Sequence, residues 1–327
     1  FWTSVAPVTP FQGVRELRPG HLLTLDLSAA SEPAAVEREY WRPRFPEDGA
    51  PCDLSLPEAT EGLLDRLRES TRLRMVRADV PVGSYLSGGI DSSLIATLGR
   101  QATEGEFRTF SIRFSDAEFD ETVYQQMMVE RLRSDHHQIL CHGREIAESF
   151  PDVIAHGERP VLRTAPAPLF LLSGLVRQNG FKVVLTGEGS DEILAGYDIF
   201  REAKVRRFWG RNPNSSWRPL LLDKLYPYLA RSPVASRAMA RKFFGQGIEN
   251  LDDPGFSHRP RWGSAAALKR MFSGDTASAV AGIDAVERLL ADLPEESSRW
   301  HPLALAQYLE IRTLLSGYLL SSQGDRM

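Results

Sequence analysis

A glycine-rich turn between an apolar run and a helical pattern constrains this chain more than any other feature. Residues 80–86 form a short apolar run that predicts a buried strand, residues 87–93 read SGGIDSS, and a helix is predicted over residues 92–103. The first N–H groups of a helix lack intrahelical partners and carry the positive end of the helix dipole. Two adjacent glycines let a ligand approach the backbone closely. The turn is therefore predicted to bind phosphate.

The charged residues around this turn restrict the kind of phosphate site. No Lys follows the glycines, so the turn differs from the Walker A pattern. Asp91 would repel a phosphate unless a divalent cation lay between the two groups. An ordinary Ser/Gly/Asp connection between a strand and a helix is the alternative interpretation.

A second turn of related design follows a strand predicted over residues 181–186. Residues 186–197 read TGEGSDEILAGY and bring Glu188, Asp191 and Glu192 close together in sequence. Carboxylates spaced in this way can share a magnesium ion, or one of them can act as a general base. The dipole of a helix N-terminus also favours acidic residues, which would explain Asp191 and Glu192 but not Glu188 between two glycines.

Strand and helix patterns alternate between these two turns. The sequence predicts an α/β fold with a parallel sheet, helices on both faces of the sheet and a mainly helical part from about residue 190. Ligands of such sheets bind beyond the carboxyl ends of the strands, where both turns are expected. Further strands are predicted at 108–114 and 136–141, and further helices at 58–77, 121–133, 144–157 and 167–179. Residues 1 to about 40 predict a hairpin and an irregular tail, and the proline-rich residues 41–57 a linker.

Composition and charge exclude several classes of protein. The chain has 327 residues, of which 42% are hydrophobic and 25% charged, and its net charge is −4. These values are typical of a globular enzyme and do not favour nucleic acid or an anionic membrane as a partner. No apolar run reaches the length of about 18 residues that a membrane helix needs. No signal peptide is visible, and the two cysteines, Cys52 and Cys141, show no pairing pattern, so a cytoplasmic location is expected.

Two short basic segments have competing interpretations. The run that contains Lys204, Arg206 and Arg207 beside Phe208 and Trp209 could bind RNA, but a solvated helix face with a buried aromatic edge is favoured. His136 and His137 are adjacent on a predicted strand, so their side chains point to opposite faces and a metal pair is disfavoured.

The two turns resemble the motifs of a known family. SGGIDS resembles the pyrophosphate loop of the ATP pyrophosphatases, and TGEGSDEILAGY resembles the second motif of the glutamine-dependent asparagine synthetases and the related β-lactam synthetases. Residues 9–21, 109–114, 119–121, 165–173 and 320–327 are also similar to segments of that family. The resemblance implies a fold like that of the adenine nucleotide α hydrolases. It also implies two domains: residues 1–45 as the end of an Ntn-type glutaminase domain plus linker, and residues 46–327 as a C-terminally incomplete ATP-pyrophosphatase domain.

The resemblance implies an AMP-forming ligase that uses ATP and Mg²⁺. A carboxylate substrate would attack the α-phosphate and release pyrophosphate, and ammonia would then convert the acyl-adenylate into an amide. Glu188 would be the general base and Asp91 and Asp191 would hold Mg²⁺. ATP and pyrophosphate would contact Leu86, Ser87, Gly88, Gly89, Asp91, Ser92, Ile112, Thr186 and Gly187. The substrate would contact Arg163, Thr164, Tyr197 and Asp325, although a solvated surface role for Arg163 is a nearly equal alternative.

Three departures from the family pattern bear on activity. No residue matches the nucleophilic cysteine of the glutaminase domain, a lysine that follows residue 327 in the family is absent, and Arg113 replaces a usual glycine. Arg113 would either contact phosphate or face solvent. Ammonia would come from solution or from glutamine hydrolysed by another piece of polypeptide.

The expected partners are small molecules, without nucleic acid or membrane, and a homodimer is left open. Aspartate is the first candidate acid, which would give asparagine. The alternative is an amidotransferase or β-lactam-synthetase-like enzyme that acts on another carboxylic acid. A non-catalytic nucleotide-binding relic is a third hypothesis, which the presence of Asp91, Glu188 and Asp191 disfavours.

Overall fold

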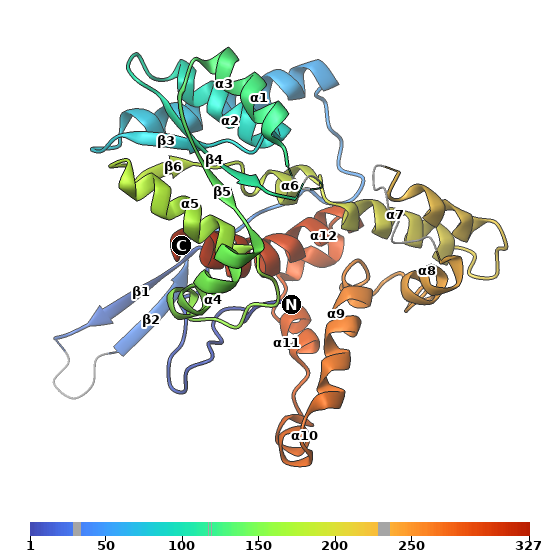
Figure 1. Cartoon of the computed structure of the whole chain (residues 1–327). Coiled ribbons are helices and arrows are strands. Elements are labelled where there is room, and N and C mark those ends of the chain that lie inside the picture. The colour runs from blue at the N-terminus through green and yellow to red at the C-terminus, as the bar shows by residue number, and fades with distance from the viewer. Residues whose placement is uncertain (29–33, 117, 119, 228–235) are drawn as a thin grey trace. The chain divides into compact units, whose positions relative to one another are not determined.

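The chain folds into two compact units that alternate along the sequence. The computed structural model describes residues 1–28, 34–116, 118, 120–227 and 236–327 (Figure 1). The first unit comprises Phe1–Val5, Leu17–Ala50 and Asp191–Leu314, and the second comprises Ala6–Glu16, Pro51–Ser190 and Leu315–Met327. Each unit contains buried hydrophobic clusters of its own. The domain boundary expected near residue 45 stays a prediction.

The second unit is built on a parallel sheet of four strands. They are β3 (Val82–Tyr85), β4 (Arg108–Phe114), β5 (Asp135–Cys141) and β6 (Val183–Leu185), in the order β5-β4-β3-β6. This confirms the predicted parallel sheet. The chain adds β4 and β5 on one side of β3 and then returns to add β6 on the other side. The direction of strand addition therefore reverses between β3 and β6.

Helices cover both faces of this sheet, as the alternating pattern predicts (Figure 1). Three helices lie on one face: α1 (Leu56–Val76), α2 (Ile90–Gln101) and α3 (Thr122–Leu132). On the other face lies α5 (Pro166–Gln178), with α4 (Gly143–Gly157) packed against it. Leu86, Ala96, Phe107 and Leu132 form the buried cluster under the first group of helices, and Phe110, Leu172 and Val176 form the cluster under α5.

The two histidines of β5 point to opposite faces of the sheet, as predicted. The ring of His136 contacts Thr109 Oγ1 through Nδ1 at 2.9 Å and Ser111 Oγ through Nε2 at 3.1 Å. The ring of His137 instead stacks on Phe110, with 5.7 Å between ring centroids. Burial lowers the pKa of His136, so its role in the fold is that of a neutral hydrogen-bonding side chain.

The first unit begins with an antiparallel hairpin of β1 (His21–Asp26) and β2 (Ala34–Glu39). The rest of it is mainly helical, as predicted for the part after residue 190. Among the described residues, no helix combines the length and the apolar character that a membrane span needs. The helices are α6 (Ser190–Leu194), α7 (Asp198–Gly210), α8 (Arg237–Phe244), α9 (Arg259–Ala266), α10 (Gly274–Val280), α11 (Ala285–Ala291) and α12 (Pro302–Glu310). The 3₁₀ segments of this unit are η1 (Arg218–Lys224), η2 (Ala267–Met271) and η3 (Glu295–Arg299). The π-helical segment η4 (Ile311–Leu319) begins in this unit and ends in the second, which also contains the π-helical turn η5 (Ser321–Asp325).

The basic run of α7 is divided between the core and the surface. Arg206 is only 1% exposed and donates hydrogen bonds to the backbone carbonyls of Phe244 at 2.8 Å, Gln246 at 2.7 Å and Phe256. Its guanidinium also lies over the Phe256 ring, 4.2 Å from the centroid. The buried aromatic edge is present at Trp209, but the prediction of a solvated basic face is wrong for Arg206, because three carbonyls outside the helix require a buried donor.

Candidate active site

The turn after β3 has the form expected of an anion-binding turn. Gly89 is the N-cap of α2, and no side chain caps the helix there. The Ser92 hydroxyl accepts a hydrogen bond from the Ser87 N–H at 3.1 Å and lies 2.9 Å from the Ser87 hydroxyl. These bonds fold the turn back on itself, while Ser87, Gly89 and Ile90 stay exposed. The helix start is thus left open toward a ligand.

Gly88 is fixed by close packing as well as by its backbone conformation. Its φ angle is +86°, which favours glycine. A Cβ atom at this position would lie 2.8 Å from Tyr124 Cβ and 3.1 Å from the Gln125 N atom. The turn therefore lies directly against the start of α3, which leaves space for glycine alone.

The turn after β6 meets the turn after β3. A Cβ atom on Gly187 would lie 2.9 Å from Asp91 Cβ and 3.1 Å from the Ser92 N atom. The strands that lead to the two turns, β3 and β6, are also in direct contact: the Ser84 hydroxyl donates a hydrogen bond to the Leu185 carbonyl at 3.3 Å. Because β3 and β6 are neighbours at the point where strand addition reverses, both turns lie at the edge of the sheet where α/β proteins of this kind commonly bind ligands.

Glu188 leaves this second turn with an exposed side chain. Its N–H donates to the Thr186 hydroxyl at 3.4 Å, and the Ser190 hydroxyl donates to the Gly187 carbonyl at 2.7 Å. Gly189, with a φ angle of +96°, turns the chain away behind it. The backbone on both sides of Glu188 is thus held by short-range hydrogen bonds, and its carboxylate is accessible from solvent.

Two of the residues expected to contact ATP come from the two central strands: Leu86 directly follows β3, and Ile112 lies within β4. Leu86 is 1% exposed, and its N–H donates to the Phe110 carbonyl at 2.9 Å. The Ile112 carbonyl accepts a hydrogen bond from Gln125 Nε2 at 3.0 Å. No sequence motif marks Gln125. It is a buried polar residue at the start of α3, and it ties β4 to the helix that packs against Gly88.

Asp191 and Tyr197 belong to the first unit. A Cβ atom on Gly196 would lie 2.0 Å from Asp191 Oδ1, and the Gly196 N–H donates to the Asp191 carbonyl at 2.9 Å. Tyr197 is the N-cap of α7 and packs beside the buried Ile199. The glycine and the tyrosine of the second motif therefore have structural roles here, and the metal and substrate roles of Asp191 and Tyr197 stay predictions.

The expected substrate residues Arg163, Thr164 and Asp325 lie in the second unit. The Arg163 guanidinium lies 5.2 Å from the ring centroid of Tyr318, a buried residue of η4, and burial raises the pKa of that phenol. The Thr164 carbonyl accepts from the Ala167 N–H at 2.9 Å at the start of α5, and Asp325 is the exposed last residue of η5. Their contacts with substrate stay predictions.

Arg113 forms an exposed ion pair with Asp120, with 4.0 Å between Arg113 Nε and Asp120 Oδ2.

Among the described residues, the expected magnesium site is not a cluster of protein ligands. In the part of the chain that the structure describes, no three His, Cys, Asp or Glu side chains gather as a metal site. Mg²⁺ commonly takes one or two carboxylates together with substrate phosphates. The partly exposed Asp91 beside the glycine turn fits that donor set.

Comparison with known proteins identifies the family. Residues 62–327 match the model of the family described as asparagine synthase. Amidase chyE of Penicillium rubens is 30% identical over 98% of this chain and 49% of its own length. Asparagine synthetase [glutamine-hydrolyzing] 1 of Bacillus subtilis is 27% identical over 66% of this chain and 32% of its own length. The chain spans about half the length, or less, of these relatives.

Among solved structures, the ammonia-dependent NAD synthetase of Campylobacter jejuni is similar over 72% of this chain and 97% of its own, with a TM-score of 0.32 and 14% identity. The family model covers both turns and every strand of the parallel sheet. The chain belongs to the asparagine synthase family.

Proposed function

We propose that this chain is the synthetase part of an ATP-dependent, AMP-forming ligase that converts a carboxylic acid into its amide. The observation that carries the proposal is the contact of Gly187 with Asp91 and Ser92, which joins the two family motifs at one end of the sheet. An open helix N-terminus for phosphate and an exposed carboxylate on Glu188 adjoin that contact. The helix N-terminus would stabilise the leaving pyrophosphate, and the carboxylate would remove a proton.

The proposed reaction has two steps that balance. An oxygen of the substrate carboxylate attacks the α-phosphorus of ATP, the bond from that phosphorus to the bridging oxygen breaks, and pyrophosphate leaves. The nitrogen of ammonia then attacks the acyl carbon of the adenylate, the bond from that carbon to the AMP oxygen breaks, and one proton leaves the nitrogen. The products are an amide, AMP, pyrophosphate and a proton.

The turn at residues 87–93 would hold the leaving pyrophosphate with its backbone N–H groups and the serine hydroxyls. Mg²⁺ held by Asp91 and Asp191 would neutralise phosphate charge when it is bound. Glu188 would take the proton from ammonia as the nitrogen attacks. Leu86, Ile112 and Thr186 would border the nucleoside, and Arg163, Thr164, Tyr197 and Asp325 would contact the acid.

We propose aspartate as the first acid to test, with asparagine as product. The similarity to an asparagine synthetase of Bacillus subtilis supports this choice. The match of nearly the whole chain to Amidase chyE supports the second candidate, an amide-forming enzyme for another carboxylic acid. In either case a glutaminase domain, of which residues 1–45 would be the end, would supply ammonia from glutamine. The two free thiols, Cys52 and Cys141, suit a cytoplasmic setting.

The experiment measures pyrophosphate and AMP formed by the protein in its natural length with ATP, magnesium and ammonium. Aspartate and a panel of other acids, aliphatic and aromatic, are supplied one at a time. Pyrophosphate that depends on aspartate, with asparagine formed in equal amount, supports the first candidate. Release with a different acid alone supports the second. ATP binding without pyrophosphate release for any acid would contradict the proposed ligase.

A further inference from the structure

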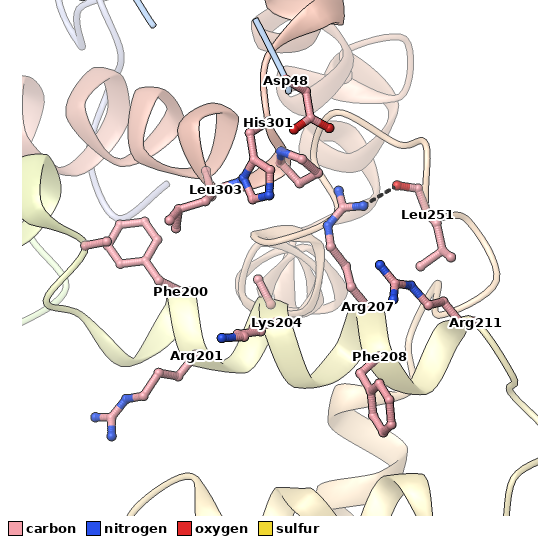
Figure 2. A pocket seen from close by; sticks show the side chains of 14 residues that line it. Asp48, Phe200, Arg201, Lys204, Arg207, Phe208, Arg211, Leu251, His301 and Leu303 are labelled. Atoms are coloured by element: carbon pink, nitrogen blue, oxygen red, sulfur yellow. Dashed lines mark hydrogen bonds between the residues drawn. The ribbon is translucent and has the colours of Figure 1, made fainter. Parts of the chain in front are cut away.

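A pocket whose lining includes Ala195, near the end of the second motif, lies within the first unit. It has a volume of about 650 Å³ and lies between α7, the start of α12 and Leu251 (Figure 2). It is called the α7 pocket here. Small-molecule sites commonly have volumes of about 300–1,000 Å³, so the α7 pocket is large enough for a compact organic ligand. It shares no residue with the turn at 87–93, and its occupation can be tested apart from the ligase chemistry.

The wall of the α7 pocket contains apolar side chains from several segments. Phe200 and Ala203 come from α7, Leu303 and Ala306 from α12, and Leu251 from the segment before α9. Phe200, Ala203 and Ala306 are buried, whereas Leu303 is 39% exposed. Such a wall favours a ligand with an apolar body, because the contact removes hydrocarbon from water on both sides.

Cationic side chains accompany this apolar wall. Lys204, Arg207 and Arg211 follow one another at spacings of three and four residues, which places them on one face of α7 and its C-cap. Figure 2 shows the guanidinium groups of Arg207 and Arg211 both directed toward Leu251, whose carbonyl accepts from Arg207 Nη1 at 2.9 Å. Burial lowers the pKa of Arg207, the charge of Asp252 raises it, and the charge of Arg211 lowers it. An anion between these groups would relieve that repulsion.

Two of the cations are available to a ligand. Within the described ranges of the chain, the side chains of Lys204 and Arg211 form neither a hydrogen bond nor an ion pair. Arg201 also borders the α7 pocket but pairs with Asp198 on its own helix, and Asp48 is the acidic residue of the lining. The lining therefore has an excess of positive charge, in a chain whose net charge is −4.

The first turn of α12 adds donors on the opposite side. His301 is its N-cap, and the His301 Nδ1 atom accepts a hydrogen bond from the Leu303 N–H at 3.1 Å. A neutral ring that accepts at Nδ1 carries its proton on Nε2, which is then a donor. The positive end of the α12 dipole lies at the same turn, so both the helix and its N-cap favour a negative group in the α7 pocket.

We propose that the α7 pocket binds a small organic anion that joins an apolar, ring-sized body to a carboxylate or phosphate group. Lys204 and Arg211 would contact the anionic group, with His301 facing it, and Phe200, Leu251 and Leu303 would contact the apolar body. The pocket geometry distinguishes this ligand from a polyanion such as RNA, which would need an extended basic surface.

The experiment uses isothermal titration calorimetry with the whole protein and four probes: 2-naphthoate, 2-naphthyl phosphate, the neutral 2-naphthamide and inorganic phosphate. We expect at least one of the two naphthyl anions to bind. Naphthamide should bind about tenfold more weakly or not at all because it loses the charge-assisted contact, and inorganic phosphate because it lacks the apolar body. Tighter binding of naphthyl phosphate would assign a phosphate ester, and tighter binding of naphthoate a carboxylate.

Two sets of variants locate the binding. Lys204→Gln should lower the affinity of the protein for the naphthyl anion about tenfold. Lys242→Gln, the same change at an exposed position of α8, should leave that affinity unchanged. Leu303→Glu should abolish binding by placing a carboxylate in the pocket, and Leu303→Gln, of nearly the same shape, should retain most of it. Thermal unfolding of each variant verifies that the fold is intact.

Three outcomes would overturn the proposal. They are the absence of binding by both naphthyl anions at millimolar concentration, equal binding of naphthamide and naphthoate, and unchanged affinity in both Lys204→Gln and Leu303→Glu. If single-stranded RNA bound instead, and Lys204→Gln weakened it, the basic face of α7 would be a nucleic-acid surface and the small-anion assignment would be wrong.

Discussion

Gly187 lies against Asp91 Cβ and against the backbone between Asp91 and Ser92, so the two family motifs are in direct contact. A methyl group in place of the Gly187 hydrogen would come within 2.9 Å of Asp91 Cβ and 3.1 Å of the Asp91 carbonyl carbon and the Ser92 N atom. Most of these atoms belong to the backbone of α2, which cannot move without displacing the phosphate-binding turn. The distance between the two turns is therefore set by the absence of one side chain.

Substitution Gly187→Ala should push the two turns apart. We expect pyrophosphate release to fall about tenfold or more, because misplacement of reacting groups by an ångström can cost a larger factor. The free energy of unfolding should fall by about 1–3 kcal/mol, the usual cost of overpacking. Steady-state kinetics and urea unfolding measure the two effects. Gly174→Ala on α5, where a Cβ would meet no atom within 4 Å, is the matched control and should retain full activity.

Substitution Glu188→Gln tests the proposed general base. The amide keeps the size of the side chain but cannot take a proton from ammonia. We expect ATP–pyrophosphate exchange driven by the acid substrate to continue, while amide formation slows by about 10²–10⁴-fold, the usual contribution of a general base. Rapid-quench measurement of adenylate and amide separates the two steps. Equal rates of amide formation in variant and wild type would remove Glu188 from this role.

Substitution Arg206→Met should destabilise the first unit strongly. The carbonyls of Phe244, Gln246 and Phe256 would lose their buried donor, and each unsatisfied group costs about 1–3 kcal/mol. We therefore expect a loss of at least about 3 kcal/mol in urea unfolding. Arg201→Met, which breaks an exposed pair with Asp198 on the same helix, should cost less than about 1 kcal/mol. A similar small effect for both variants would contradict the structural role of Arg206.

The burial of Tyr85 should make the protein less stable at alkaline pH. Burial raises the pKa of Tyr85 to about 12, above the usual value of about 10 for an unfolded chain. Because the folded state holds the proton more tightly, its stabilising effect is complete below pH 10 and is lost as the pH rises toward 12. The loss amounts to about 2–3 kcal/mol at the upper end of that range. Urea unfolding at several pH values should show that the free energy of unfolding declines less steeply with pH in Tyr85→Phe than in the wild type. Tyr40→Phe, at an exposed site, should show the same decline as the wild type.

The sheet could be predicted well because its strands are short apolar runs between clear turns. The predicted range of β4 matches the observed Arg108–Phe114, and the predicted helix at 167–179 differs from α5 by one residue at each end. The strand predicted at 181–186 is shorter in the structure, since only Val183–Leu185 pair with β3. Apolar composition alone does not show where a neighbouring strand stops providing hydrogen bonds. The hairpin expected in the first 40 residues is present as β1 and β2.

The candidate site could be predicted in part, because its motifs combine residues of unusual conformation with residues that carry charge. The sequence indicated the two glycine turns and their common edge, and the structure brings Gly187 to Asp91. It did not indicate Gln125, since a lone glutamine in a helix has no pattern that marks it as buried. The solvated position predicted for Arg206 is wrong for a related reason: its spacing from Ala203 and Trp209 places it on the buried face of α7, whereas a basic residue by itself favours a solvated position.

The pairing of β3 with β6 also constrains how the chain is made. Val82 and its partner Val183 are separated by about a hundred residues, and β4 and β5 can assemble beside β3 before β6 exists. During synthesis on the ribosome, β3 therefore has an unpaired edge until β6 emerges. Unpaired strand edges can form hydrogen bonds with other chains and so promote aggregation. The last strand to arrive both closes that edge and delivers Gly187 and Glu188. The pairing of β6 with β3 would thus cover the exposed edge and bring the two turns together in the same step.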